Sequence, residues 1–504
     1  MKMGVDIDID VGSKIKEDQA VMLDLLDILT YMSSIATSNI NRDKIFELAS
    51  QQDGITPKYL KKIRLLVKNY GYEYSKACKT VAEEASHPSL KEFLTRFSNA
   101  LSTGEKEEKF LSDEVERMIE IYKNKYTSDV ATLQKWTDAY ASLLVSVTLV
   151  IAVLLISSML FTLGDIYTMS FLSGTLLCFI AFFGVYVIYR VSPYEKMVHS
   201  LEIKSKEQRI AKRMCVFILP AIGIFSFILL ITGAEPWIVF IVVAALLAPV
   251  GILGMIDGKK IEKRDGDISP FLKSLGSIAG ATGTTLAVAM TRLDKKSVGS
   301  LEKNVNRLHK RLVNGINPKI CWYNFMGETG SGLINKSTRV FLDGIELGGD
   351  PTRIGETVSK SSLGIVLLRA KRKLVASGFM NLVIPLHASM SGIIVFIYQI
   401  MYSFNNAFAE MMGEHSTEIG GAAESMPSGL SFFNFGASVD LAFIANFVTF
   451  VVLILTLASA FASKFASGGS NYKLCFYASL LFFVSAIVLF FVPMMADKLF
   501  IIET

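Results

Sequence analysis

Seven long apolar segments divide this chain of 504 residues. Because the hydrocarbon core of a bilayer is about 30 Å thick, a helix that crosses it needs about 20 apolar residues. The pattern predicts seven spans, near residues 140–163, 166–189, 214–233, 237–256, 379–402, 441–463 and 473–496. Only two residues separate the first span from the second, and three separate the third from the fourth, so each pair is predicted to form a tight helical hairpin.

Two polar regions, residues 1–139 and 257–378, are long enough to fold as domains. Their apolar residues recur three and four positions apart, as in Val21, Leu25 and Ile28, which is typical of helices with one buried face. Both regions are therefore predicted to be helical bundles. A polar residue followed by proline is a common helix start, and we expect one at each of three pairs: Thr56-Pro57, Ser269-Pro270 and Asp350-Pro351.

The predicted fold is thus an all-α, polytopic membrane protein with about seven transmembrane helices and two cytoplasmic helical domains. Residues 1–139 form the first domain, and 140–256 form four spans in two hairpins joined by a basic loop at 190–213. Residues 257–378 form the second domain, and 379–504 form three spans with an acidic external loop at 403–440.

The second domain is predicted to repeat the first, because residues 90–104 align with residues 334–348. This alignment pairs Phe97 with Phe341, Leu101 with Ile345, and Gly104 with Gly348. A glycine at the end of each helix suits the left-handed conformation of a C-terminal cap. The alternative is a chance match between two unrelated amphipathic helices.

Composition and charge support the membrane class and orient the chain. The hydrophobic content is 51% and the mean hydropathy is +0.43, which is too apolar for an ordinary soluble protein. With a cytoplasmic N-terminus, 50 of the 51 basic residues fall on the cytoplasmic side and only Lys498 falls outside. With 37 and 9 acidic residues on the two sides, the charges are +13 (50 − 37) inside and −8 (1 − 9) outside. Basic loops stay in the cytoplasm, so the C-terminus is predicted to be external.

The candidate catalytic and metal-binding motifs in the sequence are incomplete. Residues 327–332, Gly-Glu-Thr-Gly-Ser-Gly, imitate a phosphate-binding loop, but Leu333 and Ile334 replace the required Lys and Ser or Thr. We expect a junction of small residues between helices, and no cofactor. The five cysteines form no CxxC pair and the five histidines no metal-ligand spacing, so neither a disulfide nor a metal site is expected. No catalytic residue is predicted.

His387 is the one ionisable residue near the middle of a predicted span. Such a residue is a functional candidate by default. The interpretation we favour is a neutral histidine that is hydrogen-bonded near a turn distorted by Pro385. Since a coupled transporter usually needs several such groups, their scarcity argues against transport.

The basic residues of the second domain fall into two groups. The first flanks the spans and is expected to fix orientation beside anionic lipid headgroups. Its members are Lys259, Lys260, Lys263, Arg264, Arg369, Lys371, Arg372 and Lys373. The second lies deeper in a domain that holds 21 basic and 11 acidic residues, which indicates an acidic protein partner or nucleic acid. Aromatic residues are not interleaved with these charges, so nucleic acid is not expected.

Several motifs of the second domain and of the span that follows it resemble a known family. They include Cys321-Trp-Tyr-Asn-Phe-Met-Gly-Glu, Leu347-Gly-Gly-Asp-Pro351 and Pro385-Leu-His-Ala-Ser-Met. In this order they resemble the membrane platform of the archaellum, the archaeal flagellum, which is similar to the platforms of type II secretion systems and type IV pili. The resemblance covers nearly the whole chain and is clearest in the second domain. Pilus-type relatives typically have fewer than seven spans.

The resemblance implies a non-enzymatic role in the cell membrane. A family platform docks a hexameric ATPase on its cytoplasmic face and couples ATPase motions to filament assembly and rotation. It also implies contacts with filament subunits, other motor proteins and lipids, and a homodimer. The residues predicted to dock the ATPase are Arg292, Lys295, Lys296, Lys310, Arg311, Gly348, Gly349, Asp350 and Pro351.

Two alternatives remain at this point. One is the platform of an archaeal adhesive pilus or of a type II-like secretion system, which would have no rotary role. The other is a membrane transporter, which the scarcity of ionisable residues in the spans disfavours.

Overall fold

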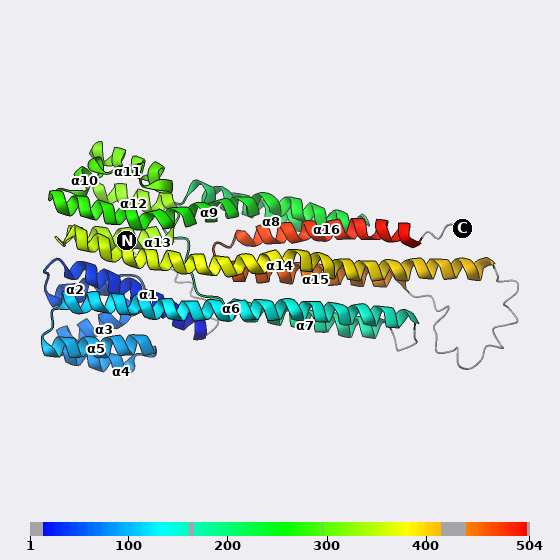
Figure 1. Cartoon of the computed structure of the whole chain (residues 1–504), viewed down its shortest axis with the longest axis horizontal. Coiled ribbons are helices and arrows are strands. Elements are labelled where there is room, and N and C mark those ends of the chain that lie inside the picture. Colours follow the sequence, from blue (N-terminus) through cyan, green and yellow to red (C-terminus); the bar gives the residue numbers. More distant parts are fainter. Residues whose placement is uncertain (1–13, 161–165, 295, 415–439, 501–504) are drawn as a thin grey trace. The chain divides into compact units, whose positions relative to one another are not determined.

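A computed structural model describes residues 14–160, 166–294, 296–414 and 440–500 of the chain (Figure 1). Within these ranges the regular structure is helical, and the β contact is an isolated bridge between Val198 and Ser331. The predicted all-α class is therefore confirmed. The first half of the chain contains α1 (Lys14–Ala36), α2 (Arg42–Ser50), α3 (Thr56–Tyr70), α4 (Tyr74–Glu84), α5 (Pro88–Thr103), α6 (Glu107–Leu160), α7 (Ile166–Val191) and α8 (Lys206–Ile231). The second half contains α9 (Pro236–Thr282), α10 (Leu286–Arg292), α11 (Glu302–Val313), α12 (Pro318–Thr329), α13 (Gly332–Glu346), α14 (Pro351–Glu414), α15 (Leu441–Ser467) and α16 (Lys473–Phe500).

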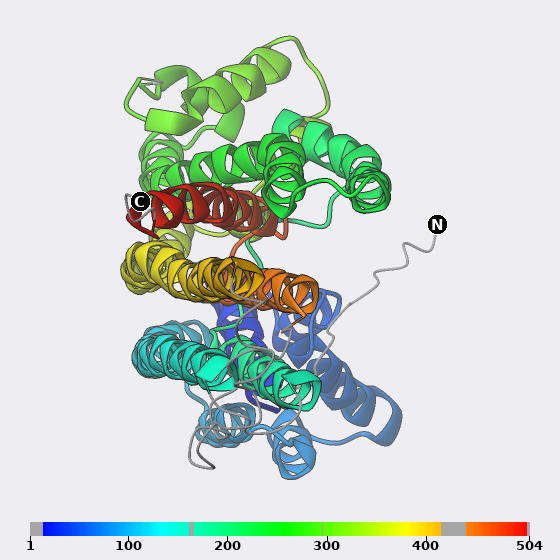
Figure 2. The same cartoon turned by 90° about the vertical axis from the view of Figure 1, so that its right-hand side faces the viewer.

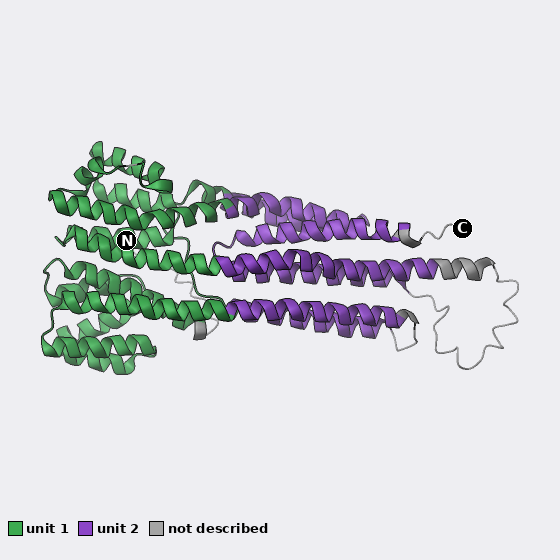
Figure 3. Cartoon of the chain, in the orientation of Figure 1, with its two compact units in different colours: residues 1–132, 190–210, 256–373 green, residues 133–189, 211–255, 374–504 purple. Residues whose placement is uncertain are grey.

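The chain divides into two compact units (Figure 3). Unit 1 comprises residues 1–132, 190–210 and 256–373, and unit 2 comprises residues 133–189, 211–255 and 374–504. The three longest helices contribute to both units without a break: α6 with 54 residues, α9 with 47 and α14 with 64. At 1.5 Å per residue they are about 81, 70 and 96 Å long.

The first polar region packs around an aromatic core in unit 1. Phe97 of α5 stacks on Phe46 of α2 and on Phe110 of α6, with ring centroids 5.5 and 5.2 Å apart. Helix α5 ends at Gly104, whose φ of 74° is the left-handed cap conformation expected of it. Helix α1 packs against α2, α3, α5 and α13, so it connects the first polar region with the second.

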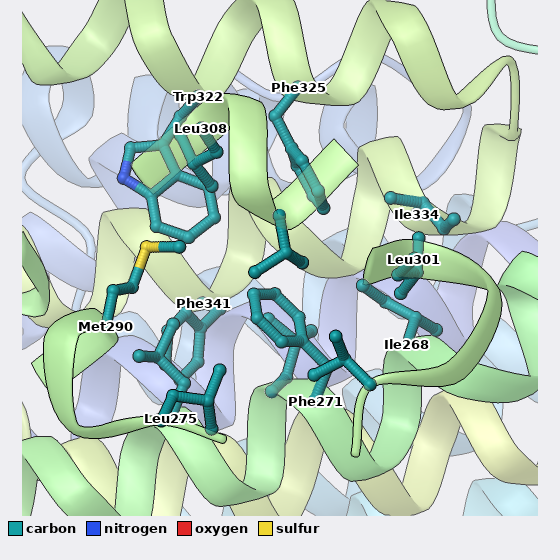
Figure 4. Packing of buried hydrophobic residues seen from close by; sticks show 14 of the residues in the cluster. Ile268, Phe271, Leu275, Met290, Leu301, Leu308, Trp322, Phe325, Ile334 and Phe341 are labelled. Atoms are coloured by element: carbon teal, nitrogen blue, oxygen red, sulfur yellow. The ribbon is translucent and has the colours of Figure 1, made fainter. Parts of the chain in front are cut away.

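The second polar region has its own apolar core in unit 1 (Figure 4). Phe271 and Leu275 of α9 lie with Trp322 and Phe325 of α12 and Phe341 of α13, and all five are buried. Phe97 and Phe341, which the alignment of the two regions pairs, both lie in such cores. Gly348 follows α13 with a φ of 85°, as Gly104 follows α5. The repeat itself stays a prediction.

The three predicted helix starts have different outcomes. Helix α14 begins at Pro351 as expected, and the Asp350 carboxylate accepts a hydrogen bond from the backbone N–H of Thr352 at 2.9 Å. Helix α3 begins at Thr56, but Thr56 is not the cap. Instead Asp24 of α1 accepts hydrogen bonds from the N–H groups of Ile55 and Thr56, at 3.0 and 2.6 Å. A carboxylate from a neighbouring helix thus replaces the local cap.

The prediction of a helix start at Ser269-Pro270 is wrong, because both residues lie inside α9. Proline lacks one backbone donor but does not have to end a helix that packing holds on both sides. Here the Ser269 hydroxyl donates to the carbonyl oxygen of Ser359 in α14 at 2.9 Å. Phe271 and Leu272 beside it are buried in the core.

Unit 2 is built from long apolar helices, which Figure 2 shows nearly end on. Helices α14, α15 and α16 (yellow, orange and red) lie side by side and share hydrogen bonds through His387. Helix α9 packs on α16, with Trp237 against Phe490 and Phe240 against Phe482. Many outward side chains of α7 and α8 are large, apolar and exposed, as expected for helices that face lipid.

Eight helices among the described residues are long and apolar enough to cross a membrane. Seven of them, α6, α7, α8, α9, α14, α15 and α16, each overlap one of the seven predicted spans. The eighth, α1, has most of its apolar window buried among the helices of unit 1, so we interpret it as a core helix. These helices make the chain an all-α, multi-pass membrane protein. Most of the predicted acidic loop at 403–440 lies outside the described residues.

Candidate functional site

Three of the basic residues predicted to dock a partner are exposed on the α10–α11 side of the second polar region. Arg292 ends α10, Lys296 follows it, and Lys310 lies on α11. Lys295 lies outside the described residues. Exposed lysine and arginine side chains attract acidic surfaces over roughly a Debye length, about 8–10 Å at physiological salt. These residues therefore form a basic surface that is available to a partner.

Arg311, a fourth predicted docking residue, is engaged inside the domain. Its Nη2 lies 2.5 Å from Oε1 of Glu328 in α12, and Arg307 reaches the other carboxylate oxygen at 2.9 Å. Burial opposes ionisation of Glu328, but the hydrogen bonds from Arg311 and Arg307 outweigh it and lower the pKa of Glu328. Arg311 thus holds α11 against α12, while Lys310 beside it points to solvent.

The segment from Gly348 to Pro351, also predicted to dock a partner, packs inside unit 1. Gly349 is buried, and a Cβ atom there would lie 2.5 Å from Oγ1 of Thr37, near the end of α1. The carbonyl of Pro351 in turn lies against Gly276 of α9, where an added Cβ would be 2.3 Å from that oxygen. Close packing therefore explains why Gly349 and Gly276 have no side chain. Gly348 and Asp350 are the exposed members of the segment.

The basic residues that flank the fifth span have an environment that the sequence did not suggest. Arg369 and Arg372 were expected beside lipid headgroups, but both are enclosed by protein. Arg369 pairs with Glu195 at 2.7 Å and with Asp265 of α9 at 2.6 Å. Arg372 pairs with Glu195 at 3.3 Å and donates to the carbonyl oxygen of Pro193 at 2.8 Å.

Four of the other flanking residues have polar partners within unit 1. Lys260 lies 2.5 Å from Glu207, and Lys373 lies 2.5 Å from Glu262. Arg264 donates to the carbonyl oxygen of Thr329 at 2.7 Å, and Lys371 donates to the Thr127 hydroxyl at 3.4 Å. The exposed members of this group are Lys259, Lys260, Lys263, Lys371 and Lys373.

The segment between α7 and α8, predicted as a basic loop, is largely built into unit 1. Met197 and His199 are buried, and the carbonyl oxygen of Met197 accepts from the N–H of Gly332 at 2.8 Å. His199 Nδ1 accepts from the N–H of Leu201 at 3.2 Å, and its Nε2 lies 3.0 Å from the carbonyl oxygen of Gly327. This geometry fits a neutral imidazole with its proton on Nε2, and burial lowers the pKa of His199 accordingly.

The motif that imitates a phosphate-binding loop is the junction between α12 and α13. Gly330 has a φ of 76°, and the Ser331 hydroxyl accepts from the N–H of Ile334 at 3.2 Å as the cap of α13. A Cβ atom at Gly327 would lie 2.7 Å from Cβ of Ile203, so the site is filled by protein. The predicted junction of small residues is confirmed. No group of metal-ligating side chains occurs among the described residues.

His387 is buried between three helices of unit 2. Its Nε2 lies 2.8 Å from the Ser485 hydroxyl of α16 and 3.3 Å from the Thr456 hydroxyl of α15. The two hydroxyls are 2.8 Å apart, and Thr456 donates to the carbonyl oxygen of Val452 at 2.7 Å. The arrangement connects α14, α15 and α16 as a hydrogen-bonded polar cluster. The helix continues through Pro385.

An apolar groove in unit 2 was not foreseen from the sequence. It has a volume of about 1010 Å³ and lies between α7 and α15, where Gly174 and Ser170 leave room beside Phe447 and Phe450. Ser170 and Gly174 are small residues four positions apart on one predicted span. Such a pair is a sequence signal for the close approach of another helix.

Comparison with known proteins supports the motif resemblance. The chain is 22% identical over 489 residues to flagella accessory protein J of Methanocaldococcus jannaschii, covering 93% of this chain and 84% of that protein. It is 21% identical over 487 residues to flagella accessory protein J of Methanococcus voltae, covering 94% and 84%. The chain is therefore similar to these proteins along nearly its whole length, which confirms the resemblance to an archaellum protein. No family model and no solved structure matches it.

Proposed function

We propose that this chain is the membrane platform of an archaellum motor. The observation that carries the proposal is the similarity to two flagella accessory proteins along more than nine-tenths of the chain. The platform would lie in the cytoplasmic membrane as a non-enzymatic homodimer, with unit 1 and the N-terminus in the cytoplasm and the C-terminus outside. It would contact archaellin filament subunits and other motor proteins.

The proposed partner of unit 1 is a hexameric cytoplasmic ATPase that drives assembly and rotation. The exposed basic residues Arg292, Lys296 and Lys310 support an acidic docking partner. Helices α6, α9 and α14 support a coupling role, because a helix without a break transmits displacement along its length. The ion pairs of Arg369 hold α9, α14 and the segment before α8 together within unit 1. A push on the docking surface would then move these helices together.

The second candidate function is the platform of an archaeal adhesive pilus or type II-like secretion system. Deletion of the gene distinguishes the two. Loss of swimming filaments with adhesive pili retained is the expected result. Loss of adhesive pili or of secretion, with swimming filaments intact, would support the alternative and overturn the proposal.

A further inference from the structure

The turn between α11 and α12 exposes three aliphatic side chains at one point of unit 1. Val313, Ile316 and Ile320 are 64%, 42% and 54% exposed, and every residue from 313 to 320 is exposed. Scattered apolar residues on a surface need no explanation, but a cluster rimmed by polar residues marks interaction sites. Val313 ends α11, which also carries Lys310, and Ile320 follows Lys319 in α12. The three aliphatic residues lie outside the apolar core that α11 and α12 bury.

The turn is held in one conformation by its own hydrogen bonds. The N–H of Ile316 donates to the carbonyl oxygen of Arg311 at 3.2 Å, and Gly315 between them has a φ of 73°. This is the hydrogen bond that closes a Schellman cap. On the other side, the Asn317 side chain accepts from the N–H of Lys319 at 2.9 Å, and Pro318 begins α12. A surface fixed before binding loses little conformational entropy when it docks.

The chain segment that leads into the turn is strongly basic. Residues 286–320 contain eight basic and two acidic residues, an excess of +6 (8 − 2). Arg307 and Arg311 are matched by Glu328, which lies outside this segment. Lys319 lies 3.1 Å from Glu346, yet its side chain is 76% exposed. The exposed aliphatic residues are thus flanked along the chain by the exposed Lys310 and Lys319, and their complement is an apolar depression with carboxylates at its edge.

We propose that Val313, Ile316 and Ile320 form an apolar plug that inserts into a pocket with an acidic rim on a soluble protein. The inference rests on the proposed function, and the partner is the cytoplasmic ATPase of the same motor. A second copy of this chain would bring two copies of this basic segment together, which charge repulsion disfavours. Insertion into lipid is disfavoured because the turn is short and its exposed aliphatic residues have no aromatic neighbour in residues 313–320.

The test uses the full chain in nanodiscs and the purified ATPase. The variant V313S/I316S/I320S removes the aliphatic groups and keeps the turn residues Gly315, Asn317 and Pro318. A matched control, L65S/Y70S, makes the same kind of change at two residues of α3 that are also exposed, 47% and 72%. Because all five positions are exposed, thermal melting of every variant should stay close to that of the wild type.

We expect the plug variant to bind the ATPase at least tenfold more weakly than the wild type, and the control to bind within about twofold of it. Binding of the plug variant within twofold of the wild type would overturn the plug and leave the proposed docking function standing. Loss of self-association by the plug variant, with ATPase binding unchanged, would overturn it in favour of a second copy. A wild-type chain that does not bind the ATPase would overturn both proposals.

Discussion

Nη1 of Arg369 lies 2.6 Å from Oδ2 of Asp265, although 104 residues separate them in the chain. Asp265 is buried on α9, Arg369 on α14 is largely buried, and Glu195 pairs with the same guanidinium. A buried ion pair contributes little net free energy, but removing one partner leaves an uncompensated charge. Arg369 is therefore expected to be essential to the packing of unit 1 rather than to orientation in the membrane.

Arg369→Gln should destabilise the chain by about 3–5 kcal/mol, because Asp265 would then be buried without a cation. Glu195 would keep only its ion pair with Arg372. Lys373→Gln is the matched control, one turn further along α14, where an exposed side chain pairs with Glu262. Its expected cost is about 0–1 kcal/mol. Thermal melting of both variants in detergent measures the difference. Equal melting temperatures would contradict the structural role of Arg369.

The Asp265 carboxyl predicts a pH dependence of stability. Burial raises the pKa of Asp265 from 3.8 to about 6, against the opposing charge of Arg369. The folded state therefore binds this proton more tightly than the unfolded state does. The stability from this group is fully present below pH 3.8 and is lost as pH rises through about 6.

Asp265→Asn cannot ionise, so the variant should gain stability relative to the wild type as pH rises from 4.5 to 7. The measurement is the difference between the two melting temperatures at these two pH values. A difference that does not change with pH would show that Asp265 does not titrate as described.

Gly276→Ala should destabilise unit 1 by about 1–3 kcal/mol, because the added methyl would overlap the carbonyl oxygen of Pro351. Gly266→Ala on the same helix is the control, since a Cβ there meets nothing within 4 Å. Alanine favours a helix over glycine, so this change should be neutral or stabilising by up to about 1 kcal/mol. If both variants melt alike, α9 and α14 are not packed as closely as described.

His387→Leu should destabilise unit 2 modestly, by about 0.6–1.7 kcal/mol, because it removes the hydrogen bonds to Ser485 and Thr456. Ser391→Ala is the control, one turn away on α14. Its hydroxyl is buried and has no hydrogen-bond partner among the described residues. The Ser391→Ala variant should therefore melt at the same temperature as the wild type. A His387→Leu variant as stable as Ser391→Ala would argue against the polar cluster.

Local patterns were sufficient for much of this fold. The apolar segments predicted all seven span-containing helices, and Asp350-Pro351 marked the start of α14. The same signal failed at Ser269-Pro270, where packing on both sides of α9 overrides the missing donor. At Thr56 the cap came from Asp24, which lies on another helix. Propensity describes a residue and its neighbours, so it cannot report a partner from elsewhere in the chain.

The candidate site depended more on distant contacts. Charge alone identified Lys296 and Lys310, which are exposed, but it could not separate them from Arg311, which pairs with Glu328. Nor could it show that Arg369 meets Asp265 and Glu195, because that requires three chain segments to come together. The exposed aliphatic turn was equally hidden, since Ile316 and Ile320 resemble core residues in the sequence.

The central claim is that the exposed basic surface of the second domain docks an acidic cytoplasmic ATPase. The most direct test is the affinity of the full chain in nanodiscs for the purified ATPase. The variant R292E/K296E/K310E reverses three exposed charges there, and K58E/K61E/K91E reverses three exposed charges in the first polar region. We predict that the first variant binds the ATPase about tenfold or more weakly than the wild type, and that the second binds within about twofold of the wild type. High salt should weaken binding of the wild type. Equal affinity for the wild type and both variants would contradict the central claim.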